Sequence, residues 1–192
     1  MNGFLLLATL TLGAHVATNT NDAPKVSVEQ VGDTYVVTAQ IELPQPVQRD
    51  VAWQVLTDYD HIAGFMSSVR ESQVVKRDGP DTWVRQKLVG KLLIFSRTEH
   101  LLLRVSEDAP DELVFDEESH QDFQLYRGTW KVHAEPQGLV IDYLLRLKPR
   151  QAPPPVVGKP TLEKAVVEVL GQFRNEIVSR ANRTPVTREA QK

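Results

Sequence analysis

A long amphipathic segment near the end of the chain constrains the fold more than any other feature. Over residues 161–181, apolar residues recur at helical spacing while most charged residues lie off this stripe. Strand-like runs precede the segment, so the apolar stripe is expected to cover a sheet. The economical arrangement places the helix in the concave face of a curved antiparallel sheet, and such a grip can leave a hollow between them. The stripe consists of Leu162, Val166, Val169, Leu170, Phe173 and Ile177.

The segments before this helix predict the sheet. Between residues 69 and 148, strand-like runs are separated by turn-forming residues without an intervening helix, which indicates an antiparallel meander. An earlier strand is predicted over residues 31–43, followed by short helices over 48–59 and 60–66. We therefore predict an α+β helix-grip fold, in which a curved antiparallel sheet wraps around a long C-terminal helix and two short helices follow the first strand.

The first 22 residues differ from the rest of the chain. Residues 4–17 are apolar or small apart from Thr9, Thr11 and His15, and this length suits a signal-peptide core better than a membrane span. We expect residues 1–22 to be a signal peptide that exports the chain to the periplasm or medium; an uncleaved anchor or a buried N-terminal helix are the alternatives. Residues 23–30 are predicted as a linker, 31–181 as one domain and 182–192 as a flexible tail.

Composition narrows the classes of function. A net charge of −3 gives no basic footprint for nucleic acid, and the absence of cysteine excludes thiolate chemistry. The five histidines are scattered without the spacing of a helical zinc site, and no glycine-rich phosphate loop occurs. We therefore predict no metal, no cofactor and no nucleic-acid partner, and leave the oligomeric state open.

Three motifs carry a family resemblance. The run from Val51 to Tyr59, VAWQVLTDY, resembles the W-x-V-L-x-D-Y pattern in the first helix of the START-like (SRPBCC) superfamily. Phe65-Met66 ahead of Val69 and the pattern Tyr126-x-Gly128-x-Trp130 also fit. The subgroup of polyketide cyclases/dehydrases and coenzyme Q-binding START domains looks nearest. This resemblance implies that an apolar prenylated or aromatic molecule binds in the hollow.

Large side chains facing the closing helix are the expected ligand-binding residues. We predict a cavity on the order of 300–1,000 Å³, typical of small-molecule sites. Gly128 either allows a ligand or the helix to approach the strand closely, or is simply part of the core. The predicted cavity walls are Trp53, Phe65, Trp83, Phe95, Tyr126, Trp130, Tyr143, Val169 and Phe173.

Two polar groups of residues leave alternatives open. Arg97 and Glu99 share one face of a strand: pointing inward they would orient a ligand's polar head, whereas pointing outward, the favoured reading, they form a solvated ion pair. Asp58, Tyr59 and His61 are weak candidates for proton transfer at the mouth of the hollow. The favoured alternative makes them a helix end, where Asp60 caps, Tyr59 packs and His61 is solvated.

The preferred hypothesis is a carrier that binds a lipid, quinone or isoprenoid-like molecule without covalent chemistry. One alternative is a polyketide cyclase or aromatase, and another is an interaction protein whose core is filled by its own side chains. The proline-rich loop over residues 153–158 is either a plain connection or a lip that touches a membrane transiently and gives an apolar ligand a route out of the bilayer.

Overall fold

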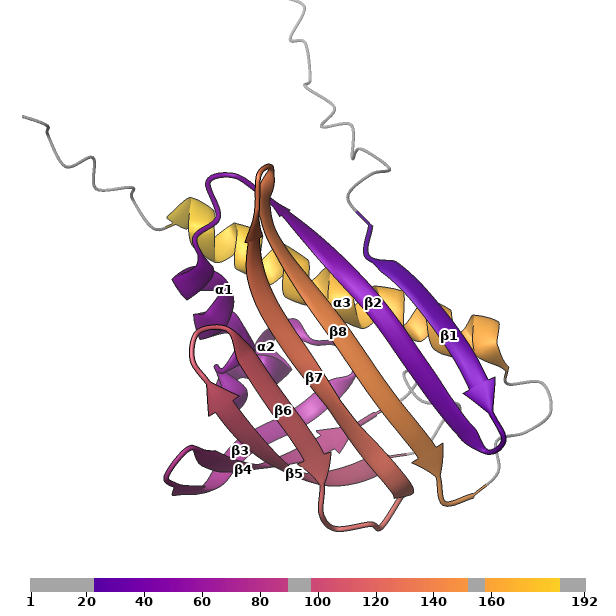
Figure 1. Ribbon diagram of the computed structural model, residues 1–192. Coiled ribbons are helices and arrows are strands. Elements are labelled where there is room, and N and C mark those ends of the chain that lie inside the picture. Colours follow the sequence, from indigo (N-terminus) through magenta and orange to yellow (C-terminus); the bar gives the residue numbers. More distant parts are fainter. Residues whose placement is uncertain (1–22, 90–97, 152–157, 184–192) are drawn as a thin grey trace, which may run out of the picture.

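The computed structural model describes residues 23–89, 98–151 and 158–183. Within these ranges, eight strands form one antiparallel sheet in the order β1-β2-β8-β7-β6-β5-β4-β3. The long helix α3 (Lys159–Arg183) lies across one face of the curved sheet, behind β7, β8 and β2 in Figure 1. This arrangement confirms the predicted α+β helix-grip fold.

The remaining elements are short. Helix α1, the 3₁₀ turn η2 and helix α2 connect β2 to β3, and the other connections between strands that the structure describes in full contain no helix. The strands are β1 (Lys25–Val31), β2 (Thr34–Pro44), β3 (Val69–Asp78), β4 (Asp81–Leu88), β5 (Glu99–Asp108), β6 (Glu112–Glu117), β7 (Phe123–Glu135) and β8 (Gly138–Pro149), and the helical elements are α1 (Arg49–Leu56), η2 (Tyr59–His61) and α2 (Ile62–Phe65).

The predicted linker over residues 23–30 is wrong, because most of it is strand β1. Val31 pairs with Thr34 across a two-residue turn, in which Gly32 adopts a left-handed φ of 59° that other residues disfavour. Val28 faces the core and α3 packs beside this strand. A Gly-Asp turn between two strand-like runs is a hairpin signal. The two short helices consequently follow the second strand, not the first.

The core lies between α3 and the concave face of the sheet. The predicted stripe on α3 is confirmed: Leu162, Leu170 and Ile177 are among the most deeply buried side chains. The helix begins earlier than predicted, with Pro160 in its first turn, where a missing N–H removes no helical hydrogen bond. It also includes Asn182 and Arg183 of the predicted tail. Residues 1–22 and 184–192 lie outside the described ranges, so the signal peptide, the anchor and the rest of the tail stay predictions.

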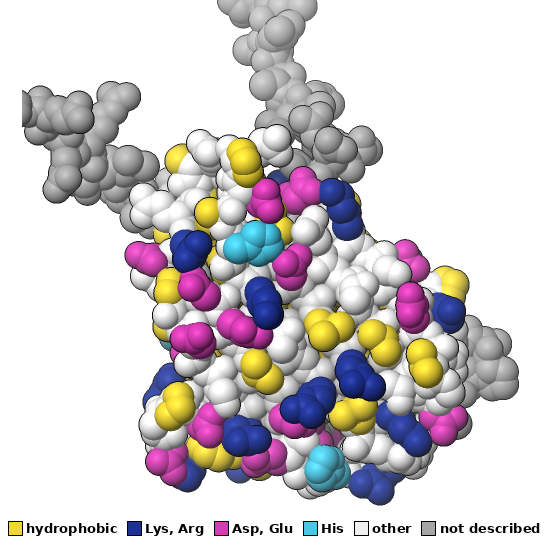
Figure 2. Space-filling view, in the orientation of Figure 1, with side chains coloured by type: hydrophobic (Ala, Val, Ile, Leu, Met, Phe, Trp, Pro, Cys, Tyr) yellow, Lys and Arg dark blue, Asp and Glu magenta, His cyan; other side chains and the backbone are white. Residues whose placement is uncertain are grey.

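The opposite face of the sheet is solvated. Figure 2 shows basic and acidic side chains interspersed over this face, with hydrophobic side chains scattered among them. Cross-strand ion pairs account for part of the pattern: Arg127 with Asp116 at 3.4 Å, and Lys131 with Glu112 at 3.3 Å. Of the helices that the structure describes, none has the length and apolar character needed to cross a bilayer.

Candidate functional site

A cavity of about 110 Å³ lies between α3, the helical segment after β2 and the concave face of the sheet. This volume is well below the predicted range of about 300–1,000 Å³, because large side chains fill much of the hollow. The described residues that line it are mostly apolar: Leu56, Tyr59, Ile62, Met66, Ser68, Val69, Val84, Gln86, Leu88, Leu103, Val105, Leu113, Phe115, Tyr126, Trp130, Tyr143, Val169 and Phe173.

Aromatic side chains from three elements make one wall of the cavity. The ring of Trp130 on β7 lies 4.4 Å from that of Tyr143 on β8 and 5.0 Å from that of Phe173 on α3, measured between centroids. Trp130 pairs with Tyr143 across the two strands, and alternation along each strand turns both side chains toward α3. Five predicted wall residues therefore line the cavity: Tyr126, Trp130, Tyr143, Val169 and Phe173.

Trp83 was predicted to line the cavity, and this prediction is wrong. Val84 and Leu88 of β4 face the core, so Trp83 lies on the opposite face of the strand. There its indole N–H donates to Glu118 Oε2 at 2.8 Å, and Lys76 Nζ sits 4.4 Å from the ring centroid. A polar N–H and a cation over the ring stabilise the half-exposed indole at the solvated face.

Trp53 and Phe65 lie beside the cavity and do not line it. Trp53 is half-buried on α1 and packs against the core, while Leu56, one helical turn later, reaches the cavity. The ring of Phe65 meets Phe173 edge-on at 5.3 Å. Phe65 therefore supports the cavity wall from behind.

Gly128 lies close to two other residues of the sheet, Leu144 and Phe115. A β-carbon at this position would lie 2.2 Å from the carbonyl oxygen of Leu144 and 2.5 Å from Cζ of Phe115. Phe115 lines the cavity, and its ring packs over the glycine. Gly128 thus makes room for the ring of Phe115, a residue of the cavity wall.

The predicted pair Arg97 and Glu99 is only partly described. Phe95 and Arg97 lie outside the described residues. Glu99 contradicts the favoured outward reading: it is 3% exposed, on the same face of β5 as the buried Leu101 and Leu103. Burial, and then the negative charge of Glu99, raises the pKa of Tyr126 above its ordinary value. The phenol of Tyr126 accordingly stays protonated at neutral pH.

Asp58 and His61, two of the three proton-transfer candidates, lie outside the cavity lining. Asp58 receives hydrogen bonds from His61 Nδ1 at 2.6 Å and from Arg180 Nη1 on α3 at 2.7 Å. Burial opposes ionisation of Asp58, but these two partners outweigh it and lower its pKa. Arg180 also contacts Glu176 at 2.7 Å. The cluster fastens the C-terminal part of α3 to the segment after α1.

Tyr59 does line the cavity, but its hydroxyl is already engaged. It donates a hydrogen bond to Glu107 Oε1 on β5 at 2.8 Å. Burial, and then this carboxylate, raises the pKa of Tyr59 far above its ordinary value. Asp60 was expected to cap a helix and instead accepts a hydrogen bond from the backbone N–H of Val74 at 2.7 Å. The residues from Asp58 to His61 thus have three different structural roles: Asp58 and His61 join the Arg180 cluster, Tyr59 bonds to Glu107, and Asp60 bonds to the backbone of β3.

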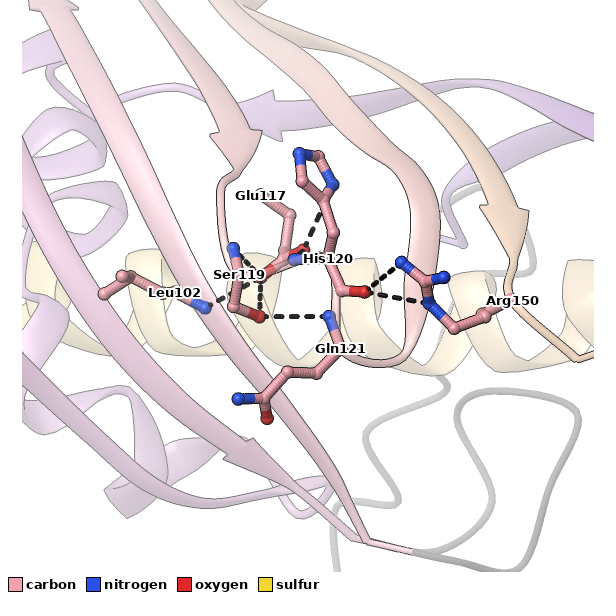
Figure 3. Close-up of polar contacts among 6 residues, drawn as sticks. All are labelled: Leu102, Glu117, Ser119, His120, Gln121 and Arg150. Carbon is pink, nitrogen blue, oxygen red and sulfur yellow. Dashed lines mark hydrogen bonds and ion pairs between the residues drawn. The ribbon is translucent and has the colours of Figure 1, made fainter.

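A buried carboxylate organises the connection between β6 and β7 (Figure 3). Glu117 is 1% exposed and accepts backbone N–H bonds from Leu102 at 3.2 Å, Ser119 at 2.8 Å and His120 at 2.7 Å. The carbonyl oxygen of His120, a residue with a left-handed φ of 51°, accepts two bonds from Arg150. Because backbone N–H groups of β5 and of the connection already engage the carboxylate, Glu117 has a structural role.

Sequence reasoning missed about two thirds of the cavity lining. Alternation along β4 and β5 contains the signal: Val84, Gln86 and Leu88 share one face, as do Leu103 and Val105. Ser68 gives no such signal, since it lies in the turn before β3. Within the described ranges, no group of three or more histidine, aspartate or glutamate side chains is placed to hold a metal ion.

A curved antiparallel sheet closed over a long terminal helix, with a cavity between them, defines a START-like domain. The chain belongs to the family described as polyketide cyclase / dehydrase and lipid transport, whose profile matches residues 45–174. No curated protein sequence matches the chain.

Solved structures with the same fold come from proteins of different activities. The STAR-related lipid transfer protein of Xanthomonas axonopodis superimposes with a TM-score of 0.66 at 15% identity, covering 82% of this chain and 94% of that one. The Zhui aromatase/cyclase of Streptomyces sp. R1128 gives 0.59 at 14%, covering 78% and 93%. The lipid transfer and protein localization domain of human StarD13 gives 0.61 at 15%, covering 81% and 85%. These similarities establish the fold alone.

Proposed function

We propose that this protein binds an apolar small molecule in the cavity between α3 and the sheet, and carries it without covalent chemistry. The observation that supports this most is the cavity itself, walled by Trp130, Phe173 and aliphatic side chains. Burial of apolar surface contributes about 25 cal/mol per Å², so such walls favour a hydrophobic ligand.

The size of the cavity limits what enters without rearrangement. A dry cavity of roughly 150 Å³ accommodates benzene, so about 110 Å³ suits a compact molecule of that order. A lipid, quinone or isoprenoid would require α3 to move away from the sheet. The contacts between Asp58 and Arg180, between Ser67 and Gln172, and between Arg174 and the carbonyl oxygen of Glu42 are among the polar ties that such a movement breaks.

The cyclase alternative lacks support from the geometry. Asp58 and His61 do not line the cavity, and the side chain of His61 is 76% exposed. Tyr59 reaches the cavity with its hydroxyl bonded to Glu107. Proton transfer to a bound substrate requires a group within hydrogen-bond reach of it.

Filling the cavity tests the proposed function. Val169→Phe adds a ring at the cavity wall, whereas Val167→Phe makes the same change two residues away, at a position outside the lining. Excluding about 60 Å² of ligand surface weakens binding by roughly tenfold. We expect this loss for Val169→Phe and little change for Val167→Phe, measured by titration with a panel of quinones, fatty acids and linear polyketide mimics.

The same panel separates the alternatives. Product formation from a polyketide mimic that disappears in His61→Ala would show an enzyme. A wild-type protein that binds no member of the panel, and yields nothing to extraction with organic solvent and mass spectrometry, would favour an interaction protein with a filled core.

A further inference from the structure

The part of the cavity wall that β7 and β8 form carries hydrogen-bond donors without a partner in the fold. The hydroxyls of Tyr126 and Tyr143 and the indole N–H of Trp130 make no hydrogen bond to any described residue, although all three side chains line the cavity. Buried tyrosine and tryptophan side chains usually find a partner for these groups. These donors on two neighbouring strands are therefore free to bind a ligand.

The two phenol hydroxyls differ from the other unpartnered hydroxyl of the wall. The hydroxyl oxygen of Ser68 is closed to a water molecule. The hydroxyls of Tyr126 and Tyr143 are not closed in this way, so each keeps surface that a water molecule reaches. Tyr143 is 8% exposed and packs against Trp130 and Phe115, so the open surface of its hydroxyl lies inside the hollow.

Two other polar side chains of the described lining are already engaged. Tyr59 donates its hydroxyl hydrogen bond to Glu107 at 2.8 Å, and the amide nitrogen of Gln86 donates to the hydroxyl of Ser72 at 3.2 Å. The described lining contains no lysine, arginine or histidine. The hydrogen-bonding capacity left open in the described wall is therefore concentrated in the neutral donors of β7 and β8.

Both phenols act as donors, and their surroundings oppose an anion. Burial, and then the negative charge of Glu99, raises the pKa of Tyr126. Burial, and then the nearby Tyr126, raises the pKa of Tyr143. Both hydroxyls therefore stay protonated at neutral pH and donate to an oxygen acceptor. The charge of Glu99 close to Tyr126 disfavours a negatively charged ligand in the same space.

We propose that the cavity takes a neutral, largely apolar molecule with a carbonyl or ether oxygen, and that this oxygen lies against the β7–β8 wall and accepts hydrogen bonds from Tyr126 and Tyr143. This inference rests on the proposed function and names the chemical class of its ligand. The rings of both tyrosines contact Phe115, at 5.9 and 6.4 Å between centroids, so one small molecule reaches both hydroxyls. A site built to hydrogen-bond a ligand rejects the analogue that leaves its polar groups unpaired.

Two probes of equal shape test this proposal on the full chain. Cyclohexanone and methylenecyclohexane differ only by a carbonyl oxygen in place of a CH₂ group. We expect each of Tyr126→Phe and Tyr143→Phe to weaken cyclohexanone binding by about threefold to tenfold, the effect of one neutral hydrogen bond, and the double variant by about tenfold or more. Methylenecyclohexane binding stays within about twofold of wild type, less than the effect of one hydrogen bond. NMR titration of the backbone amides gives the affinities.

Tyr59→Phe is the matched control, because it removes a hydroxyl from the same lining that is already bonded to Glu107. We expect Tyr59→Phe to lower the melting temperature and to leave the preference for the ketone over the hydrocarbon unchanged. The hydroxyls of Tyr126 and Tyr143 make no bond in the empty protein, so Tyr126→Phe and Tyr143→Phe should not lower the melting temperature. Circular dichroism measures these temperatures and shows that each variant is folded.

Each remaining outcome counts against a stated part of the reasoning. A preference for cyclohexanone that survives the double substitution, or that is lost in Ser68→Ala, overturns the role of the two tyrosines while the proposed function stands. A single variant without effect overturns the role of that tyrosine. Cyclohexanecarboxylate bound more tightly than cyclohexanone overturns the preference for a neutral ligand. Failure of the wild-type protein to bind cyclohexanone and methylenecyclohexane alike overturns both this inference and the proposed function.

Discussion

Replacing Gly128 by alanine is expected to destabilise the protein strongly, although alanine adds only one carbon. That carbon would lie 2.2 Å from the carbonyl oxygen of Leu144 and 2.5 Å from Cζ of Phe115, well inside ordinary contact distance. Neither neighbour yields easily. The carbonyl belongs to β8, which pairs with β7, and the ring of Phe115 is packed against Tyr126 and Tyr143.

The magnitude follows from these two contacts. Overpacking a buried site costs about 1–3 kcal/mol, and disturbing a strand hydrogen bond adds about 1 kcal/mol. A loss of about 2–4 kcal/mol lowers the melting temperature of a chain of this size by roughly 5–15 °C. Gly128→Ala also pushes Phe115 toward the cavity, so the affinity for apolar probes should fall with the stability.

Thermal unfolding followed by circular dichroism measures this effect. Gly171→Ala is the matched control, because a β-carbon at this position in α3 meets nothing within 4 Å. Alanine there removes the conformational freedom of glycine inside a helix, so we expect a gain of about 0.5–1 kcal/mol. Adding Phe115→Leu to Gly128→Ala should recover part of the loss. A Gly128→Ala variant that melts within about a degree of wild type would refute the reasoning.

Three further predictions concern the polar clusters. Arg180→Met should lower stability at neutral pH, because Arg180 contacts the carboxylate of Asp58. The folded pKa of Asp58 is lowered, so the stabilising contribution of Asp58 is present above about pH 4 and is lost as the pH falls through that folded pKa. Melting curves of variant and wild type should therefore converge in acid. His61→Ala should change probe affinity by no more than about twofold, less than the loss of one hydrogen bond, since its side chain lies outside the cavity lining; a titration showing a larger loss would return His61 to the site. Glu117→Gln should lower the free energy of unfolding in urea by about 2–3 kcal/mol, because charge-assisted bonds from three backbone N–H groups are weakened; an unchanged midpoint would contradict this.

The fold could be predicted largely from periodicity. The stripe around Leu170 and Phe173 and the alternation that buries Tyr35 and Ile41 both follow from a fixed geometric repeat. Strand β1 was missed because polar residues are interspersed with its valines and most of the strand is exposed. Its pairing with β2 depends on the turn at Gly32, which a reading by hydrophobicity alone overlooks.

The site could be predicted only in part, because alternation does not say which face of a strand is the inner one. On β4 the largest side chain, Trp83, points outward, where Lys76 of β3 and Glu118, just after β6, contact it. Glu99 faces inward despite its charge. Ser68 lines the cavity next to Ser67, which hydrogen-bonds to Gln172, 105 residues away in the chain. Contacts over such distances leave no local pattern in the sequence.

The strand order has a consequence for how the chain is made. Strand β2 is sandwiched between β1 and β8, so Gln40 reaches its neighbour Asp142 across 102 residues of sequence. During synthesis, the β1–β2 hairpin emerges early and exposes the apolar face of β2 until β8 and then α3 leave the ribosome. Closing so long a loop slows folding. The hairpin therefore spends most of translation as an unpaired edge, the state in which a nascent chain most needs a chaperone.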